Sequence, residues 1–250
     1  MTAETATDRT VLCLTGADRA HFLQGLVTHD AQAGALVYSA LLSPQGKYLA
    51  DFFLLDRGDD ILLDVKSDLA AGLMARLSMY RLRADVQIAD TKMPVARGIG
   101  TAPETGFADP RHPALGWRAY GMAAGAPTTD WDALRVAHII PETGIELVPD
   151  ESYILEMGFD RLAGVDHRKG CYVGQEVTAR MKHKTALRKG LARVAVQGRA
   201  PVGTPILADG KPVGKLFTQS GDRALAYLRF DRATGKMTAG DAHLTWDQGR

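Results

Sequence analysis

Cys171 lies in a segment whose residue types could support thiolate chemistry, 169-KGCYVGQEVTARMKHK-184. The pattern predicts a helix from Gly174 to about His183, which places Cys171 just before its amino end. Unpaired backbone N–H groups and the helix macrodipole favour an anion there, and the basic run 167-HRK-169 adds positive charge. Because both effects stabilise a thiolate, Cys171 is a candidate nucleophile or metal ligand. The alternative is a small buried side chain, since free cysteines are often buried.

The cysteine count disfavours an iron–sulfur cluster held by this chain alone. Such clusters take about four thiolates, and the sequence has two cysteines, Cys13 and Cys171. Cys171 could still be a transient cluster ligand, with the other ligands from a second copy or a partner. The cysteines lie far apart in sequence and outside any CxxC motif, which argues against a disulfide framework and for a reducing compartment.

Two carboxylates occur in contexts that call for a partner. Glu156 lies within the apolar run 152-SYILEMGFD-160, where a carboxylate needs a hydrogen-bond donor. That donor is either a ligand ring with N–H groups or a buried arginine such as Arg135. Asp51, after 43-SPQGKYLA-50, presents the same ambiguity.

A cluster of cations lies at and beyond the end of the predicted helix. Its members are Arg180, Lys182, His183, Lys184, Arg188 and Lys189. These residues could bind phosphate or a polycarboxylate, but a solvated helix end whose charge suits the helix dipole is the favoured interpretation. The lack of interleaved aromatic residues disfavours direct nucleic-acid binding.

The elements that position these residues follow from hydrophobic periodicity and turn residues. A strand is predicted over 10–16 and a helix over 17–31, followed by an antiparallel meander over 35–65. A helix over 67–82 and a strand over 83–90 complete an α+β unit with helices on an antiparallel sheet.

The second half of the chain has a different texture. A helix is predicted over 130–140, with Asp130 as its cap and Leu134, Ala137 and His138 on one face. From residue 190 onward, short β runs are divided by Gly, Pro and Asp turns. This spacing predicts a small barrel or sandwich domain.

Composition excludes several functional classes. Lys and Arg total 30 against 29 Asp and Glu, so no global field selects nucleic acid or a membrane surface. No apolar run approaches the roughly 20 residues of a membrane-spanning helix. The opening MTAETATDRT has neither an apolar stretch nor the composition of a transit peptide. We therefore expect a soluble, cytoplasmic protein.

The octapeptide 169-KGCYVGQE-176 closely resembles the K-G-C-[YF]-x-G-Q-E signature of the YgfZ-type folate-binding proteins. These proteins are relatives of the aminomethyltransferase (T-protein) of the glycine cleavage system. Other matching segments are 22-FLQGLVTHD-30, 41-LLSPQGKYLADFFL-54, 80-YRLRADV-86, 135-RVAHIIPE-142, 155-LEMGFD-160 and 224-ALAYLR-229. The resemblance therefore covers nearly the whole chain.

The resemblance implies an α+β fold of three small domains in a ring around a central cavity, with a C-terminal β-barrel. The first domain would comprise residues 1–34 and 115–185, the second residues 35–114 and the barrel residues 186–250. The implied function is that of a tetrahydrofolate-binding accessory protein for the assembly or repair of [4Fe–4S] enzymes, which indirectly supports tRNA modification. Its implied partners are folate and iron–sulfur client or scaffold proteins.

The resemblance also assigns roles to individual residues. Cys171 would be the functional thiol, and Glu156 would bind the pterin N–H face of tetrahydrofolate or a one-carbon derivative. The remaining residues expected at the folate site are Arg135, Lys169, Gly170, Tyr172, Gly174, Gln175 and Glu176.

The chain departs from the T-protein pattern in two ways. T-proteins carry two adjacent acids where 45-QGKYLAD-51 has only Asp51, and they usually lack the cysteine of the octapeptide. Both differences count against a classical enzyme. A folate-dependent, aminomethyltransferase-like one-carbon transferase that uses Asp51 for proton transfer is the alternative function. The oligomeric state is not determined by the sequence.

Overall fold

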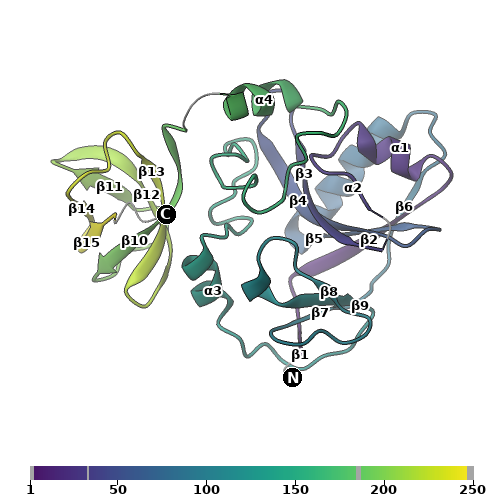
Figure 1. Ribbon diagram of the computed structural model, residues 1–250, viewed down its shortest axis with the longest axis horizontal. Coiled ribbons are helices and arrows are strands. Elements are labelled where there is room, and N and C mark those ends of the chain that lie inside the picture. Colours follow the sequence, from purple (N-terminus) through teal and green to yellow (C-terminus); the bar gives the residue numbers. More distant parts are fainter. Residues whose placement is uncertain (1–2, 33, 184–186, 247–250) are drawn as a thin grey trace. The chain divides into compact units, whose positions relative to one another are not determined.

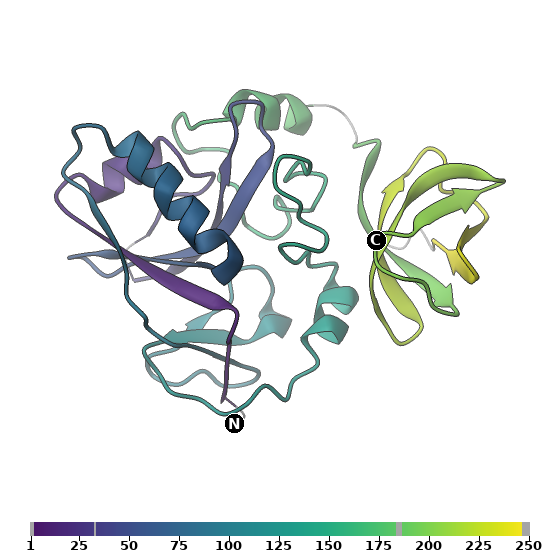
Figure 2. The ribbon, with the colours of Figure 1, turned by 180° about the vertical axis from the view of Figure 1, so that it is seen from behind.

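The computed structural model describes residues 3–32, 34–183 and 187–246 (Figures 1 and 2). The chain forms two compact units. The first comprises Met1–Thr129 and Asp160–Val177, and the second comprises Asp130–Phe159 and Thr178–Arg250. Each unit contains a hydrophobic core of its own. The predicted division at residues 34, 114 and 185 remains a prediction.

The larger sheet of the first unit is antiparallel throughout, with strand order β3-β4-β5-β2-β6. The strands are β2 (Arg9–Thr15), β3 (Leu36–Leu42), β4 (Tyr48–Asp56), β5 (Ile61–Lys66) and β6 (Gln87–Asp90). Strands β3, β4 and β5 are the predicted meander, which the structure confirms. Their joining turns contain Gly46 and Gly58, both with positive φ, as short connections between antiparallel strands often require.

One face of this sheet is apolar and packs against α1 (Arg19–Gln24) and α2 (Ser67–Arg81). Because side chains alternate between the faces of a strand, Ala50, Phe52 and Leu54 of β4 belong to this core. The intervening Asp51 and Phe53 point to the opposite face. On β4, Asp51 and Phe53 thus lie on the face of the sheet that points away from the helices.

A second, smaller sheet of the first unit has the strand order β1-β7-β9-β8. Its strands are β1 (Ala3–Thr5), β7 (Val95–Gly98), β8 (Phe107–Ala108) and β9 (Trp117–Tyr120), with a 3-10 turn η1 (Pro113–Leu115) before β9. The stretch around GWRAY therefore forms a short strand.

The second unit contains α3 (Trp131–His138) and a closed barrel of order β10-β13-β12-β11-β14-β15. The barrel strands are β10 (Lys189–Gln197), β11 (Pro205–Ala208), β12 (Lys211–Ser220), β13 (Arg223–Arg229), β14 (Lys236–Ala239) and β15 (Ala242–Thr245). The predicted C-terminal barrel is confirmed. Asp130 caps α3, because its carboxylate accepts the Ala133 N–H at 2.9 Å.

Three sequence expectations need correction. The predicted helix over 17–31 ends at Gln24, because the following residues turn to form an isolated bridge between Val27 and Leu41. The predicted strand over 83–90 begins only at Gln87, after a turn that follows α2. The buried side chains of α3 are Arg135 and Val136, not the face predicted from Leu134, Ala137 and His138.

No helix among the described residues is long and apolar enough to span a membrane.

Candidate functional site

Cys171 is a free, exposed cysteine in the irregular segment that leads into α4 (Gln175–His183). The helix begins one residue later than predicted, so the thiol lies outside its first turn. The backbone is held just after the cysteine, where Val173 N donates to Gly25 O at 3.2 Å and Gln175 N donates to Tyr172 O at 3.2 Å. The alternative of a buried structural cysteine is therefore wrong.

Lys169 anchors the segment on the other side of the cysteine. Its side chain is 1% exposed, and its Nζ donates to the backbone oxygens of Gln24 (2.6 Å) and Val27 (2.8 Å). The same ammonium group lies 3.1 Å from the Asp30 carboxylate and 4.9 Å from the ring centroid of the buried Tyr172. Cations suit the carboxyl end of a helix, so Lys169 stabilises the end of α1.

The other two cations expected to support a thiolate also have partners elsewhere. His167 Nε2 lies 2.6 Å from Asp160 Oδ1. The Arg168 side chain is 96% exposed and lies 4.0 Å from the Asp166 carboxylate. Each of the three basic side chains thus lies beside a carboxylate, which compensates part of the positive charge expected to support the thiolate.

Gly174 places the octapeptide directly against the turn between β3 and β4. Its φ is +84°, and a Cβ there would lie 2.6 Å from Ser43 O and 2.9 Å from Leu42 Cβ. On the facing turn, a Cβ at Gly46 would lie 2.7 Å from Val177 Cβ. Only glycine allows this approach of two backbones, so the two glycines fix the position of the cysteine segment.

The remaining octapeptide residues are less constrained. A Cβ at Gly170 would have its nearest neighbour, Gln24 Nε2, at 3.9 Å, which is an ordinary contact distance. Gln175 is half-buried, and Glu176 is exposed in the first turn of α4, where a carboxylate complements the helix dipole.

The cations at the far end of α4 match the favoured interpretation of a solvated helix end. Arg180, Lys182 and His183 are exposed and lie in the last turn. Lys184 lies outside the described residues. Lys189 belongs to β10 and serves a different purpose, because its Nζ lies 3.6 Å from the Glu156 carboxylate.

Glu156 is a buried carboxylate that is paired within the second unit. Tyr227 of β13 donates its hydroxyl to Glu156 Oε2 at 2.5 Å. Burial and the adjacent carboxylate together raise the pKa of Tyr227 well above its ordinary value. The backbone is tied as well, since Leu191 N donates to Glu156 O at 2.7 Å. The Tyr227 hydroxyl and the Lys189 ammonium group therefore supply the hydrogen-bond donor and the positive charge that the apolar context of Glu156 requires.

Arg135 does not supply the Glu156 partner that was considered from the sequence. It is buried and donates to Glu146 (3.0 Å), Thr218 (2.8 Å) and Asp132 (2.9 Å). Burial lowers its pKa, but the neighbouring carboxylates outweigh that effect and raise the pKa above its ordinary value. Arg135 therefore joins α3 to the barrel.

Asp51 is also buried and paired, in the first unit. Its two carboxylate oxygens accept the hydroxyls of Tyr38 (2.9 Å) and Tyr48 (2.7 Å). Burial, with the Asp51 charge beside it, raises the pKa of Tyr38 well above its ordinary value. Arg111 lies over the Tyr38 ring, with 5.5 Å between its guanidinium carbon and the ring centroid, and pairs with Asp109 at 2.8 Å.

A second buried carboxylate extends this polar face of the sheet. Asp64 accepts hydrogen bonds from Arg9 (2.6 Å), Arg118 (3.2 Å) and Tyr120 (3.1 Å). The Arg118 guanidinium lies 4.1 Å from the Phe53 ring centroid. These charges are compensated within the protein, which makes the network a structural joint between the two sheets of the first unit.

Sequence reasoning did not identify Tyr227, Tyr38 or Tyr48 as partners of the two carboxylates. One signal in the sequence was the alternation of side chains in β4, which places Asp51 and Phe53 on the same face of the strand. This alternation places Asp51 on the face opposite the apolar core, but it does not identify the hydrogen-bond partners of the carboxylate.

The number of side chains that could coordinate a metal ion limits what the site can bind. Among the residues that the structure describes, no group of three His, Cys, Asp or Glu side chains could hold a metal ion. Cys171 can therefore offer one sulfur ligand to a metal centre. The octapeptide (residues 169–176) and Asp51 belong to the first unit, whereas Glu156 and Arg135 belong to the second.

Comparison with known proteins gives relatives over most of the chain. The sequence is 30% identical to the iron–sulfur cluster assembly factor IBA57, mitochondrial, of Homo sapiens, over 92% of this chain and 78% of the relative. It is also 30% identical to the mitochondrial IBA57 homolog of Mycosarcoma maydis, over 88% of this chain. The match spans 63% of that fungal protein, which is less than two thirds of its length.

Two further comparisons concern the fold. Residues 188–248 match the family model of the CAF17 C-terminal β-barrel domain. The whole structure resembles the glycine cleavage system aminomethyltransferase T from Bartonella henselae, with a TM-score of 0.75 and 14% identity over 97% of this chain and 83% of that one. The predicted T-protein-like fold is thereby confirmed.

The expected cytoplasmic location is contradicted by these relatives, which are named as mitochondrial proteins. The expectation depended partly on cysteine usage. Cysteine usage separates oxidising from reducing compartments, but it does not separate one reducing compartment from another.

Proposed function

Because the chain belongs to the family of IBA57-type iron–sulfur cluster assembly factors, we propose that it assists the assembly or repair of [4Fe–4S] proteins through Cys171. The observation that carries this proposal is an exposed thiol on a segment anchored at Lys169 and Gly174. A fixed, accessible sulfur can be offered to a cluster on another protein without a large ordering cost.

The ligand count supports an accessory role. A cluster takes about four ligands, and this chain offers one exposed cysteine among the described residues. The cluster is therefore cargo, and its other ligands come from a client or scaffold protein. Cys13 is poorly suited to the task, because its Sγ lies 3.4 Å from the Asp60 carboxylate, and burial and that carboxylate raise its pKa.

The test replaces each cysteine in cells that carry a single copy of the gene. With Cys171→Ser, we expect the activity of a [4Fe–4S] enzyme, such as tRNA methylthiolation, to fall to the level of the deletion strain. Cys13→Ser is the matched control and should retain normal activity. Protein abundance is measured in parallel, so that loss of folding is separated from loss of the thiol.

Normal enzyme activity with Cys171→Ser, beside a deficit in the deletion strain, would remove the thiol from the proposal. It would leave the assembly role itself intact. Normal activity in the deletion strain would remove the assembly role.

We further propose that the protein binds tetrahydrofolate or a one-carbon derivative, with Glu156 as acceptor for N–H groups of the pterin. The carboxylate fits this role because its two oxygens offer about four lone-pair sites, of which Tyr227 and Lys189 use part. The bound folate would supply one-carbon or redox chemistry. The protein's own contribution would be to orient the ring.

Titration calorimetry with tetrahydrofolate tests this second proposal. Glu156→Gln should weaken binding about tenfold or more, as expected when a hydrogen bond to a charged group is lost. Glu151→Gln, at an exposed glutamate of the same unit, should leave binding unchanged. Equal affinity of the two variants would exclude Glu156 as a folate ligand.

Kinship with the YgfZ-type proteins and a role in tRNA modification are also part of the proposal. The octapeptide supports kinship with the YgfZ-type proteins, and support of tRNA modification would follow indirectly through [4Fe–4S] client enzymes. The alternative, a folate-dependent transferase that uses Asp51, is disfavoured because each carboxylate oxygen of Asp51 already accepts a tyrosine hydroxyl. Formation of methylenetetrahydrofolate from an aminomethyl donor, lost in Asp51→Asn, would revive it.

A further inference from the structure

The end of α2 gathers exposed apolar side chains and arginines into one patch. Three of the five large hydrophobic side chains that are exposed among the described residues lie here, with Met79 78%, Tyr80 37% and Leu82 89% exposed. Figure 2 shows α2 on the outside of the larger sheet. Clustered apolar side chains on a surface, unlike scattered ones, mark interaction sites. We call this surface the α2-end patch, and its members are Arg76, Met79, Tyr80, Arg81, Leu82 and Arg83.

The arginines of the patch lack carboxylate partners. Among the residues that the structure describes, the side chains of Arg76 and Arg83 form no hydrogen bond or ion pair, and the Arg81 side chain donates only to Val86 O, at 3.2 Å. Asp85 is close in sequence, but its carboxylate already accepts a backbone N–H group at 3.1 Å. The positive charge of the patch is therefore available to a binding partner.

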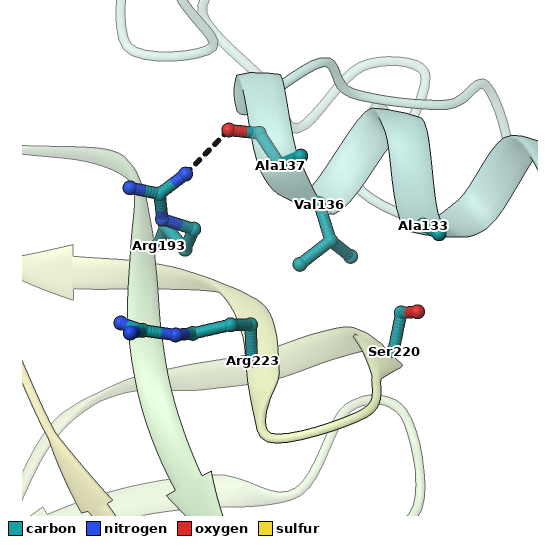
Figure 3. Close-up of a pocket in the computed structure, with 6 residues that line it drawn as sticks. All are labelled: Ala133, Val136, Ala137, Arg193, Ser220 and Arg223. Atoms are coloured by element: carbon teal, nitrogen blue, oxygen red, sulfur yellow. Dashed lines mark hydrogen bonds between the residues drawn. The ribbon is translucent and has the colours of Figure 1, made fainter.

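Arginines on the barrel differ in this respect. Beside the pocket between α3 and the barrel, Arg193 donates a hydrogen bond to Ala137 O (Figure 3), and Arg223 Nε lies 3.8 Å from Asp222 Oδ1. None of the large exposed hydrophobic side chains of the described residues lines that pocket. Uncompensated arginines and exposed apolar side chains thus occur together at the α2-end patch.

Leu82 keeps an unfavourable backbone conformation within the patch. Its φ of 46° and ψ of −104° are rare for a leucine, and its side chain is 89% exposed, so packing inside the protein does not offset the cost. The turn is nevertheless fixed, because Asp85 N donates to Asp18 Oδ2 at 2.8 Å. Backbone strain persists where the surroundings enforce it, often at binding sites. The strained turn is therefore suited to present Leu82 as an apolar anchor for a partner.

Helix α1 joins the α2-end patch to the cysteine segment within the first unit. At the start of the helix, Asp18 N donates to Asp85 O at 3.2 Å, and at its end Gly25 O accepts the Val173 N–H at 3.2 Å. With six residues, α1 is about 9 Å long. A standard protein interface covers about 800 Å² on each partner. A single partner can therefore cover both the patch and Cys171.

We propose that the α2-end patch docks the cluster-carrying protein that Cys171 serves, through an acidic surface of that protein with an apolar pocket for Leu82. Carboxylates of the partner pair with Arg76 and Arg83, which orients the complex. Tyrosine, methionine and arginine, all present in the patch, are residue types enriched in protein interfaces. Docking brings the cluster to the thiol in a fixed orientation. This inference rests on the proposed assembly role of Cys171.

Two other classes of partner fit the patch less well. A single-stranded nucleic acid stacks its bases on aromatic side chains, and this patch has one aromatic residue, Tyr80, beside two aliphatic side chains. An anionic membrane binds helices whose apolar side chains continue along one face, but the exposed positions that precede Arg76 include the small residues Ala71, Gly72 and Ala75. A protein with a local apolar pocket is the better match.

The experiment is photo-cross-linking of the full chain in living cells. The photoreactive residue p-benzoylphenylalanine replaces Tyr80 in the patch or Arg168, whose exposed side chain lies three residues before Cys171. We expect both positions to capture the same iron–sulfur protein, identified by mass spectrometry. The cross-link from position 80 should lie in a segment of that protein rich in Asp and Glu. Glu104 is the control position, because it is exposed in the connection between β7 and β8 of the smaller sheet, and it should not capture this protein.

Substitutions within the patch measure its contribution to docking. Leu82→Ala and Arg76→Glu should each lower the cross-linking yield from position 168 about tenfold, as expected when an anchor is truncated or a charge is opposed. Both should also lower the activity of the [4Fe–4S] enzyme in the cells. Arg199→Glu is the matched control, because it reverses the charge of an exposed arginine outside the patch, and it should change the yield less than about twofold. Circular dichroism of each variant confirms that a loss of docking is not a loss of folding.

Three outcomes would overturn the docking proposal. The first is the capture of different proteins, or of none, at positions 80 and 168. The second is an equal loss of cross-linking with Arg76→Glu and Arg199→Glu. The third is patch-dependent binding of phosphatidylglycerol vesicles or of an RNA oligonucleotide without capture of a protein at position 80, which would assign the patch to a membrane or to nucleic acid.

Failure of the docking proposal can be distinguished from failure of the assembly role. Loss of [4Fe–4S] enzyme activity with Cys171→Ser, beside full activity with Leu82→Ala and Arg76→Glu, would remove the patch and leave the role of the thiol. Retained activity with Cys171→Ser, beside capture of the same iron–sulfur protein at both positions, would remove the role of the thiol and leave the docking surface.

Discussion

At the scale of single residues, Glu156 and Asp51 show how a carboxylate in an apolar run is accommodated by its own hydrogen-bond donors. Asp51 accepts two tyrosine hydroxyls, and Glu156 accepts one and lies beside the Lys189 ammonium group. A hydrogen bond to a charged group contributes about 1.5–3 kcal/mol. The donors are therefore as important to the fold as the carboxylates themselves.

Removal of the Tyr227 hydroxyl should change how stability depends on pH. The pKa of Tyr227 is raised in the folded protein, so its stabilising effect is fully present below the unfolded value of about 10 and is lost as pH rises above it. We expect Tyr227→Phe to lower the free energy of unfolding at pH 7. Above pH 10, the free energy of unfolding of this variant should decline less steeply than that of the wild type. Urea titrations between pH 7 and 11 measure both effects.

The control is Tyr80→Phe, at a tyrosine exposed on α2, which should follow the wild-type curve. If the free energies of unfolding of Tyr227→Phe and wild type changed in parallel with pH, the Tyr227 hydroxyl would not be the donor to Glu156, and its pKa would not be raised.

A substitution at Asp51 can distinguish a stabilising role of its carboxylate from a catalytic role. Asp51→Asn weakens two buried hydrogen bonds, so we expect the free energy of unfolding to fall by about 2–4 kcal/mol. Activity per folded molecule in the [4Fe–4S] assay should be retained. Undiminished stability combined with lost activity would instead indicate a chemical role for this carboxylate. Urea unfolding and the cellular assay, performed on the same variant, decide between them.

At the scale of elements, two glycines of the octapeptide have opposite tolerance to the same change. Gly174→Ala places a Cβ 2.6 Å from Ser43 O at a φ of +84°, which should cost about 2–4 kcal/mol and displace the cysteine segment. Gly170→Ala has its nearest contact at 3.9 Å and should change stability by less than about 0.5 kcal/mol. Thermal unfolding and [4Fe–4S] enzyme activity should both separate the two variants, and equal behaviour would refute the close packing.

The end of α2 contains a leucine in a conformation that suits glycine. Leu82 has φ 46° and ψ −104° and is 89% exposed, and Ala84 N donates to Arg81 O at 2.8 Å across the turn. Leu82→Gly should relieve this strain and raise the free energy of unfolding by about 1 kcal/mol. Leu82→Ala retains the strain and should give no gain. Equal stabilisation by both variants would assign the effect to the exposed side chain rather than to the backbone.

At the scale of the whole molecule, the parts of the fold that could be predicted were those encoded locally. The β3–β5 meander, the cap of α3 and the barrel follow from alternation, turn residues and capping. The site depends on partners distant in sequence, such as Glu156 with Tyr227, 71 residues apart, and Lys169 with Gln24, 145 residues apart. No local pattern specifies such pairs, which is why the anchoring role of Lys169 was not foreseen.

The two hydrophobic cores predict how the molecule unfolds. Leu63 lies in the core of the larger sheet and Leu228 in the core of the barrel, and both are fully buried. Leu→Ala at such positions costs about 2–5 kcal/mol. Because the two cores share no residue, we expect two calorimetric transitions, with Leu63→Ala lowering one and Leu228→Ala lowering the other. Met79→Ala, at an exposed position, should lower neither. A single transition lowered equally by both core variants would mean that the two units unfold as one cooperative structure, in which damage to the barrel would also release the segment that presents Cys171.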